Sequence, residues 1–284
     1  MLYRRLGRTG LKVSVLSLGT GGPNRFGQAR YVSRKDIISL ARRALDLGIN
    51  YFDTAGSYED AESRLGEALR GVPRDQYYLS SKVLPLNGNS MISAAETRQL
   101  VERTLRRMRV EALDILFLHR LSPQSYDEAL VRLAPALQSL RAEGKIRFIG
   151  ISESTTLDQR HGVLKRALQD DFFDTIMVAY HMANRSAEEE VLPLAQAKDV
   201  GVIGMVAARH LVTRNASERL RLFSKALLGL ATSPRGLDEL NARLRSALSI
   251  LRRPVSKRAA CIAREVSAGV LTLPAAGNFL QFGL

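Results

Sequence analysis

Four polar residues that are able to exchange or orient protons lie at the ends of three apolar stretches. Asp53 ends the first stretch and Tyr58 follows it in a loop, while Lys82 and His119 end the next two. In a parallel (β/α) barrel the reacting groups lie at the carboxyl ends of the strands, so this pattern predicts one shared active site. The three stretches are residues 50–54, 77–83 and 114–119.

These residue types predict proton transfer to an oxygen. A lysine that ends an apolar strand is costly to desolvate unless it is paired, and Asp53 on the preceding strand is its natural partner. A cation beside Tyr58 stabilises the phenolate and so makes the tyrosine a proton donor, and His119 then orients the accepting oxygen. Carbonyl reduction needs this proton together with a hydride, which no side chain supplies. The chemistry therefore requires a nicotinamide, although no glycine-rich dinucleotide fingerprint is present.

Apolar stretches of strand length alternate with helix-patterned stretches from residue 15 to residue 207. The connections are short, which favours parallel strands with helical crossovers in one continuous domain. We therefore expect a single (β/α)8 TIM barrel over residues 1–284, preceded by a β-hairpin over residues 3–14. The expected strands are 15–18, 50–54, 77–83, 114–119, 146–152, 174–180 and 202–207, and the expected helices are 34–47, 60–69, 93–108, 126–142, 157–168 and 187–198.

The regular alternation ends after residue 208. Basic helical pieces are expected at 216–228, 237–251 and 256–266, and an eighth strand at 269–273. The residues that remain after this strand are too few for another helix, which predicts a shortened C-terminus.

Composition favours a soluble, globular protein of a reducing compartment. The chain is 45% hydrophobic and 25% charged, and it has neither a run of about 20 apolar residues nor the apolar core of a signal peptide. Its single cysteine, Cys261, excludes an intrachain disulfide and a cysteine-rich metal site. We expect a cytoplasmic protein without a metal site.

The formal charge is +14, and residues 201–284 hold 13 of the 42 Lys and Arg but only 4 of the 28 acids. A solvated basic surface and a contribution to binding an anionic cofactor both account for this excess. Nucleic acid is a further partner for such charge, but this segment lacks interleaved aromatic residues and any nucleic-acid-reading motif.

Four motifs, in order along the chain, resemble those of the aldo-keto reductases. They are Leu6-Gly-Arg-Thr-Gly-Leu-Lys-Val-Ser14, Gly48-Ile-Asn-Tyr-Phe-Asp-Thr-Ala55 with Tyr58, Leu79-Ser-Ser-Lys82, and Asp114-Ile-Leu-Phe-Leu-His119. The similarity extends with gaps over residues 2 to 278. It implies a (β/α)8 barrel that uses NADPH, or NADH, to reduce an aldehyde, ketone or sugar carbonyl, or to catalyse the reverse oxidation. The resemblance implies Tyr58 as the acid, Asp53 and Lys82 as the residues that tune it, and His119 as the residue that orients the carbonyl.

The resemblance also implies a set of cofactor contacts, some of which are altered in this chain. Family members present Ser-Asn after the fifth strand, where this chain has Ser152 and Glu153; the carboxylate is either a solvated loop group or a sign of altered cofactor geometry. Met177 replaces a glutamine, Met205 replaces an aromatic residue, and no helix follows Asn278. Tyr180 and His181 are expected to line the pocket. The implied cofactor residues are Gly19, Thr20, Asp53, Ser152, Glu153, Met177, Met205 and Asn278.

The same residues allow two other functions. One is a redox-inactive family member that acts as a binding or regulatory protein, which the altered nicotinamide contacts favour. The other is a non-redox acid–base enzyme, catalysing elimination or isomerisation with the same four residues.

Overall fold

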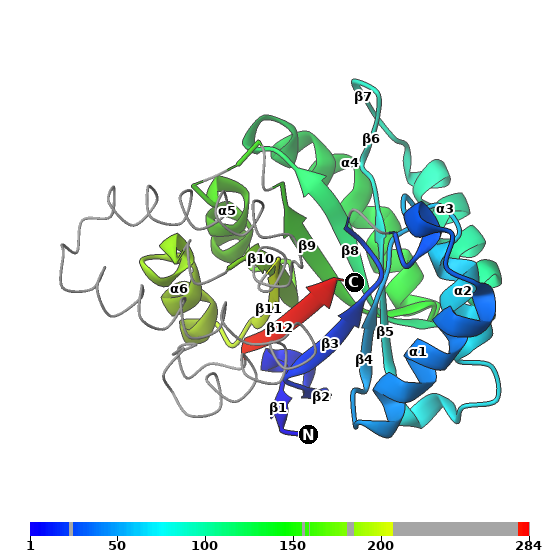
Figure 1. Ribbon diagram of the computed structural model, residues 1–284. Coiled ribbons are helices and arrows are strands. Elements are labelled where there is room, and N and C mark those ends of the chain that lie inside the picture. Colours follow the sequence, from blue (N-terminus) through cyan, green and yellow to red (C-terminus); the bar gives the residue numbers. More distant parts are fainter. Residues whose placement is uncertain (23–24, 155–156, 159, 181–184, 207–277, 284) are drawn as a thin grey trace.

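The computed structural model describes residues 1–22, 25–154, 157–158, 160–180, 185–206 and 278–283. Eight parallel strands close into a barrel in the order β10-β11-β12-β3-β4-β5-β8-β9, with helices around its outside (Figure 1). The expected (β/α)8 barrel is therefore confirmed. The barrel strands are β3 (Leu16–Gly19), β4 (Tyr51–Asp53), β5 (Tyr78–Val83), β8 (Leu113–Leu121), β9 (Ile146–Glu153), β10 (Thr175–Ala179), β11 (Gly201–Met205) and β12 (Asn278–Gly283).

The helices begin and end at residues with local reasons to do so. The first helix follows Ser33, whose hydroxyl accepts a hydrogen bond from the Asp36 amide at 3.1 Å, and its apolar face is buried against the barrel. A capping box of Ser93 and Glu96 begins the third helix. The helices are α1 (Arg34–Asp46), α2 (Ala61–Ala68), α3 (Ala94–Met108), α4 (Pro123–Ala142), α5 (Gly162–Asp170) and α6 (Val191–Ala197).

The expected N-terminal hairpin is present and closes one end of the barrel. Strands β1 (Tyr3–Arg5) and β2 (Lys12–Ser14) pair antiparallel, and the turn between them places Leu6 against the start of β11. A Cβ atom on Gly201 would lie 2.8 Å from the Leu6 side chain, so the backbone approaches closely here. The hairpin packs on the inward-facing core at the amino ends of the strands, which leaves the carboxyl ends for the site. That inner core comprises Leu6, Leu11, Val13, Tyr51, Ile115, Phe117, Met177 and Ile203.

Three helix boundaries differ from those expected. The helix expected at 157–168 begins only at Gly162, because the Asp158 carboxylate accepts the amides of Gly162 (2.8 Å) and Val163 (2.7 Å) and caps it there. Helix α4 begins at Pro123 rather than at residue 126, since proline suits the first helical turn. The helix expected at 187–198 is divided into a 3-10 turn, η4 (Ser186–Glu188), and α6 (Val191–Ala197), in which Pro193 falls in the first turn.

The eighth strand also differs from the one expected. The barrel is closed by β12, whose residues Leu280 and Gly283 pair with Leu16 and Gly19 of β3. Residues 269–273 lie outside the described residues, as do the helical segments expected at 216–228, 237–251 and 256–266. Apart from the barrel, β6 (Leu86–Asn87) and β7 (Ser90–Met91) form a short antiparallel hairpin.

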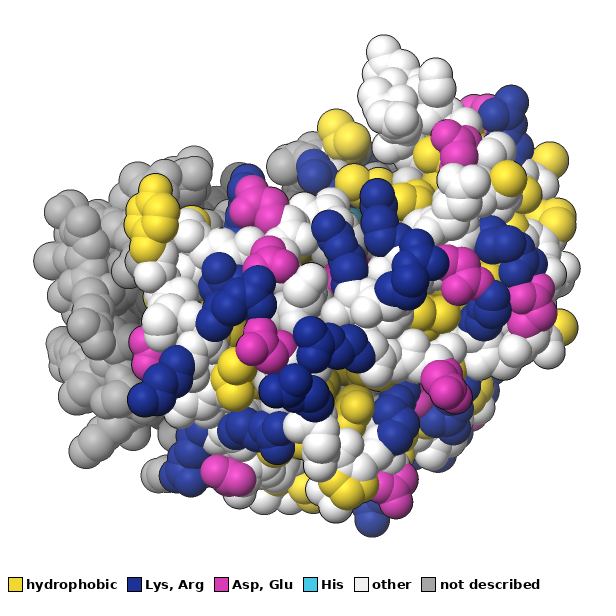
Figure 2. All heavy atoms as spheres, turned by 90° about the vertical axis from the view of Figure 1, so that its right-hand side faces the viewer, with side chains coloured by type: hydrophobic (Ala, Val, Ile, Leu, Met, Phe, Trp, Pro, Cys, Tyr) yellow, Lys and Arg dark blue, Asp and Glu magenta, His cyan; other side chains and the backbone are white. Residues whose placement is uncertain are grey.

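Basic and acidic side chains are mixed on the face formed by the first three helices (Figure 2). Arg34 pairs with Asp60 (2.6 Å) and Glu67 (2.7 Å), and Arg98 pairs with Glu143 (2.6 Å). The positive charge of this face is thus partly neutralised by neighbouring carboxylates. In the part of the chain that the structure describes, no helix has the length and apolar character of a membrane span.

Candidate active site

Asp53 and Lys82 meet inside the barrel, at the carboxyl ends of the neighbouring strands β4 and β5. Their residues are only 1% and 3% exposed, and the ammonium donates a hydrogen bond to the Asp53 carboxylate. Lys82 Nζ also donates to the Thr54 carbonyl at 2.7 Å, and the Ser80 hydroxyl donates to Asp53 Oδ1 at 2.6 Å. The predicted buried pair is therefore present, and both charges have hydrogen-bonding partners.

Tyr58 lies beside both Lys82 and His119. The Lys82 ammonium is 5.2 Å from the centre of the tyrosine ring, and the imidazole of His119 lies edge-on to the same ring at 5.8 Å with an interplanar angle of 82°. Tyr58 follows β4, and His119 lies near the carboxyl end of β8. The structure thus brings the loop residue Tyr58 close to Lys82 and His119, two of the three residues that the sequence placed at strand ends.

The electrostatics fix the charge states of two of these residues. Burial lowers the pKa of Lys82, but the Asp53 charge and the neighbouring Tyr58 outweigh it, so that the pKa is raised and lysine remains a cation. Burial, together with the charges of Lys82 and Arg120, lowers the pKa of His119 well below its usual value. The imidazole is therefore neutral over the physiological pH range.

His119 is held with one ring nitrogen unused. Its Nδ1 atom is buried and has no hydrogen-bond partner among the described residues. A β-bulge follows at once, where Arg120 adopts φ +60° between His119 and Leu121 in the pairing with β9. The strand therefore presents a neutral imidazole beside the tyrosine, which suits it to bind a polar oxygen.

Several predicted cofactor residues lie next to this group. Gly19 pairs with Asp53 in the register of β3 and β4, and Ser152 pairs with His119 in that of β8 and β9. Thr20 is fully buried, and its hydroxyl hydrogen-bonds the Thr54 hydroxyl at 2.8 Å. Gly19 and Ser152 are thus beside the site, whereas the Thr20 side chain serves to join two loops.

Glu153 is not a solvated loop carboxylate, because it is 2% exposed and both of its oxygens are bonded within the protein. Oε1 accepts the Ala179 amide at 2.6 Å, and Oε2 lies 2.7 Å from His161 Nδ1. The other imidazole nitrogen is 2.8 Å from the Ser186 hydroxyl. This network joins the ends of β9 and β10 to η4, so Glu153 serves the fold here.

The remaining predicted cofactor residues differ in position. Met177 is 1% exposed in the inner core, and it pairs with Ser152, which in turn pairs with His119, so it lies in the same layer of the barrel as the histidine. Asn278 begins β12 and pairs with Val202, at the amino end of the strand and about 16 Å along it from Gly283. Met205 ends β11 and is only partly buried, so it remains at the open end of the barrel.

The pocket residues expected after β10 have different outcomes. Tyr180 is buried, and its hydroxyl bonds the Glu188 carboxylate, which Arg185 also binds. Burial raises the pKa of this tyrosine, and the Glu188 carboxylate raises it further. The residue therefore attaches η4 to the strand end, while His181 lies outside the described residues.

Residues that the sequence did not single out surround Tyr58. Gln28, in the 3-10 turn η2 (Gln28–Arg30), hydrogen-bonds the backbone on both sides of Glu59, and Gly21 packs against the tyrosine ring. Gly21 lies two residues after the end of β3, and a glycine at such a position in a sequence indicates close packing. A glutamine in a polar loop carries no such signal.

Comparison with known proteins agrees with this geometry. The Aldo/keto reductase family profile matches residues 16–221. L-galactose dehydrogenase of Arabidopsis thaliana is 35% identical over 205 residues, which are 70% of this chain and 63% of that protein. An NADH-specific methylglyoxal reductase of Escherichia coli is 29% identical over 221 residues, 71% of this chain and 65% of that protein. The chain thus spans less than two thirds of the length of these curated relatives.

A solved structure extends the similarity to nearly the whole barrel. The holo form of an aldo-keto reductase from Bacillus halodurans superposes with a TM-score of 0.63 at 25% identity, covering 91% of this chain and 94% of that one. The family profile covers well over half of the sequence, and the barrel is the fold that the motifs implied. This chain belongs to the aldo/keto reductase family.

Proposed function

We propose that this protein is a nicotinamide-dependent carbonyl oxidoreductase in which Tyr58 is the general acid. The observation that supports this most directly is the Lys82 cation, held by Asp53 inside the barrel and 5.2 Å from the centre of the Tyr58 ring. A buried cation at this position favours the phenolate that remains when tyrosine gives up its proton.

In reduction, Tyr58 donates its hydroxyl proton to the carbonyl oxygen, and the Lys82 cation stabilises the phenolate until a proton returns from solvent. The neutral imidazole of His119 binds and orients the same oxygen. A bound nicotinamide supplies the hydride that the carbonyl carbon accepts. In the reverse reaction the phenolate removes the alcohol proton, so the same residues serve both directions.

We assign the nicotinamide to the open end of the barrel. Ser152, opposite His119 in register, has a hydroxyl suited to a carboxamide, and Gly19 allows close backbone approach beside Asp53. Met205 at the end of β11 offers an apolar contact. Glu153 and Asn278 do not fit this role, because both oxygens of Glu153 are bonded within the protein and Asn278 lies at the amino end of its strand.

We further propose that the substrate is an aldehyde, ketone or sugar carbonyl and that NADPH is the preferred carrier. Relatives of this chain include an L-galactose dehydrogenase and an NADH-specific methylglyoxal reductase, so both sugars and small aldehydes belong in the first panel of substrates. The excess of basic residues in this chain favours the carrier with the additional phosphate.

The test compares Tyr58→Phe with Tyr78→Phe, a matched control at the amino end of β5. Loss of a general acid lowers turnover by about 10² to 10⁴-fold. We expect this loss only in Tyr58→Phe, with NADPH affinity in a fluorescence titration unchanged in both variants. Full activity of Tyr58→Phe on a substrate that the wild type reduces would refute the mechanism.

A redox-inactive binding protein is the second candidate. It is favoured by Glu153, whose two oxygens are bonded to Ala179 and His161 in place of any ligand. Titration with NADPH and with NADH separates the two functions. Saturable binding of either supports the enzyme, and no binding of either supports the second candidate.

A further inference from the structure

The loop between β3 and α1 packs directly on the segment that carries Tyr58. A Cβ atom added to Gly21 would lie 2.8 Å from two carbons of the Tyr58 ring and 3.0 Å from its hydroxyl oxygen. Arg25 in the same loop forms an ion pair with Glu59, the residue after the tyrosine. The loop therefore bounds the tyrosine on one side, and it is joined to the neighbouring segment by charge as well as by packing.

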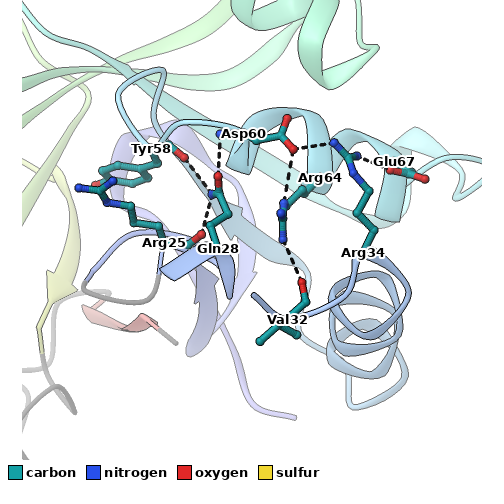
Figure 3. A network of polar contacts seen from close by, with 8 residues as sticks. All are labelled: Arg25, Gln28, Val32, Arg34, Tyr58, Asp60, Arg64 and Glu67. Carbon is teal, nitrogen blue, oxygen red and sulfur yellow. Dashed lines mark hydrogen bonds and ion pairs between the residues drawn. The ribbon is translucent and has the colours of Figure 1, made fainter. Parts of the chain in front are cut away.

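Gln28 makes the central polar contact between these two segments. Its Nε2 atom donates to the carbonyl oxygen of Tyr58 at 3.2 Å, and its Oε1 atom accepts the amide of Asp60 at 3.0 Å (Figure 3). Nε2 also donates to the carbonyl of Arg25 at 2.6 Å, within its own loop. One side-chain amide thus binds the backbone on both sides of Glu59.

The segment that Gln28 holds is locally strained. Glu59 has φ +55°, in the left-handed region that residues other than glycine rarely adopt. Arg25 (φ +43°) and Phe26 (φ +55°) in the facing loop have the same feature, and the fully buried Phe26 side chain anchors that loop in the core. Such conformations persist only where the surroundings hold them, and they concentrate at functional sites.

We propose that Gln28 is a positioning residue that sets the place of the Tyr58 hydroxyl relative to Lys82 and His119. This inference rests on the proposed role of Tyr58 as the acid. The tyrosine backbone is held by Gln28 and by the Ala61 amide, which donates to the same carbonyl at 3.1 Å. Without the glutamine, Glu59 can relax, and the ring moves from the position that it occupies beside the ammonium and the imidazole.

Two substitutions separate positioning from simple space filling. Gln28→Met keeps the length of the side chain but removes its hydrogen bonds. Gln28→Glu keeps the shape and the acceptor for the Asp60 amide, but it places an anionic oxygen against the carbonyls of Tyr58 and Arg25. If Gln28 only filled space, the glutamate variant would behave as the wild type does. Arg34→Gln is the control, because it breaks the ion pairs of Arg34 with Asp60 and Glu67 without touching Tyr58.

We expect kcat to fall by about 10 to 100-fold in both Gln28 variants, since a displacement of about 1 Å can cost 10²-fold in rate. The affinity for NADPH should not change. The loss should appear in kcat and not in KM for the carbonyl substrate, because the substitutions displace the tyrosine and leave the rest of the barrel opening in place. The Arg34→Gln control should keep the wild-type kcat and KM. Should Gln28→Met fail to fold, the isosteric Gln28→Glu decides.

Values of kcat within about twofold of wild type in both variants would overturn the inference, and so would a loss confined to KM. An equal loss in Arg34→Gln would also overturn it, because the effect would then be general loosening. The proposed function is tested separately by Tyr58→Phe: if that variant is inactive while the Gln28 variants are normal, only the positioning role fails.

Discussion

Removing Asp53 should destabilise the protein strongly, because it leaves a buried cation without its counter-charge. In Asp53→Ala, Lys82 keeps the Thr54 carbonyl as a partner at 2.7 Å, but its side chain is 2% exposed and water cannot replace the carboxylate. Breaking one side of a buried ion pair costs about 3–5 kcal/mol. At roughly 2–4 °C per kcal/mol for a chain of this size, Tm should fall by about 6–20 °C.

The assay is a double-mutant cycle measured by urea and thermal unfolding. Lys82→Met leaves the Asp53 carboxylate with the Ser80 hydroxyl but without its cation, so it should also destabilise by several kcal/mol, and it should reduce kcat as well. The variant carrying both Asp53→Ala and Lys82→Met has neither charge of this buried pair. It should be more stable than either single variant.

The reasoning would be refuted by either of two results. One is a decrease of less than about 1 kcal/mol in the free energy of unfolding of Asp53→Ala, which would mean that water reaches Lys82 readily. The other is a double variant whose loss equals the sum of the two single losses, since two side chains that interact in a buried pair must show coupling.

Two further predictions concern the same site. Gly21→Ala should lower kcat by about 10 to 100-fold, because the added Cβ atom would lie 2.8 Å from the Tyr58 ring. Gly56→Ala is the control and should leave kcat unchanged, since its added Cβ atom would have its nearest neighbour at 3.7 Å. Equal kcat values for the two variants would contradict the prediction. His119 should make stability depend on pH. The pKa of His119 is lowered in the folded state, so below the ordinary value of about 6.5 the unfolded chain binds more protons than the folded one. The contribution of His119 to stability is therefore complete above that pH and is lost as the pH drops. Urea unfolding at pH 7.5 and 5.5 should show that this residue lowers the free energy of unfolding by at most about 1.4 kcal/mol per pH unit. The decrease should be absent in His119→Gln. Equal pH dependence in the two proteins would contradict the prediction.

The barrel and the four strand-end residues could be predicted from the sequence because each rests on a local pattern. Short apolar runs alternate with helical periodicity through β11, and the polar residues Asp53, Lys82 and His119 stand at the ends of such runs. A buried charge at the end of an apolar strand requires a partner, so the pairing of Asp53 with Lys82 followed from the strand order.

The environment of Glu153 could not be predicted in this way. A carboxylate after a strand looks the same in the sequence whether it is solvated or buried, and its partners are His161 in the next loop and Ser186 beyond a further strand. The burial depends on how the ends of β9 and β10 meet η4. No local pattern contains that information.

The closing strand shows a different reason for error. Residues 269–273 and 278–283 are both short apolar runs, and periodicity alone does not decide between them. The choice is made by pairing, since β12 must match the register of both β3 and β11. Both neighbours are known only once the barrel is closed.

The position of Tyr58 differs in kind from the positions of the other three site residues. Asp53, Lys82 and His119 are fixed by strands whose register leaves them little freedom, whereas Tyr58 lies in a loop, one residue before a strained backbone conformation at Glu59. A proton donor must be held to a fraction of an ångström if it is to meet the accepting oxygen. The loop has its own backbone hydrogen bonds to Ala55 and Ala61, and the Gln28 amide adds two from another segment. In the mechanism that we propose, the residues that determine the rate of proton transfer therefore include one whose chemistry takes no part in it.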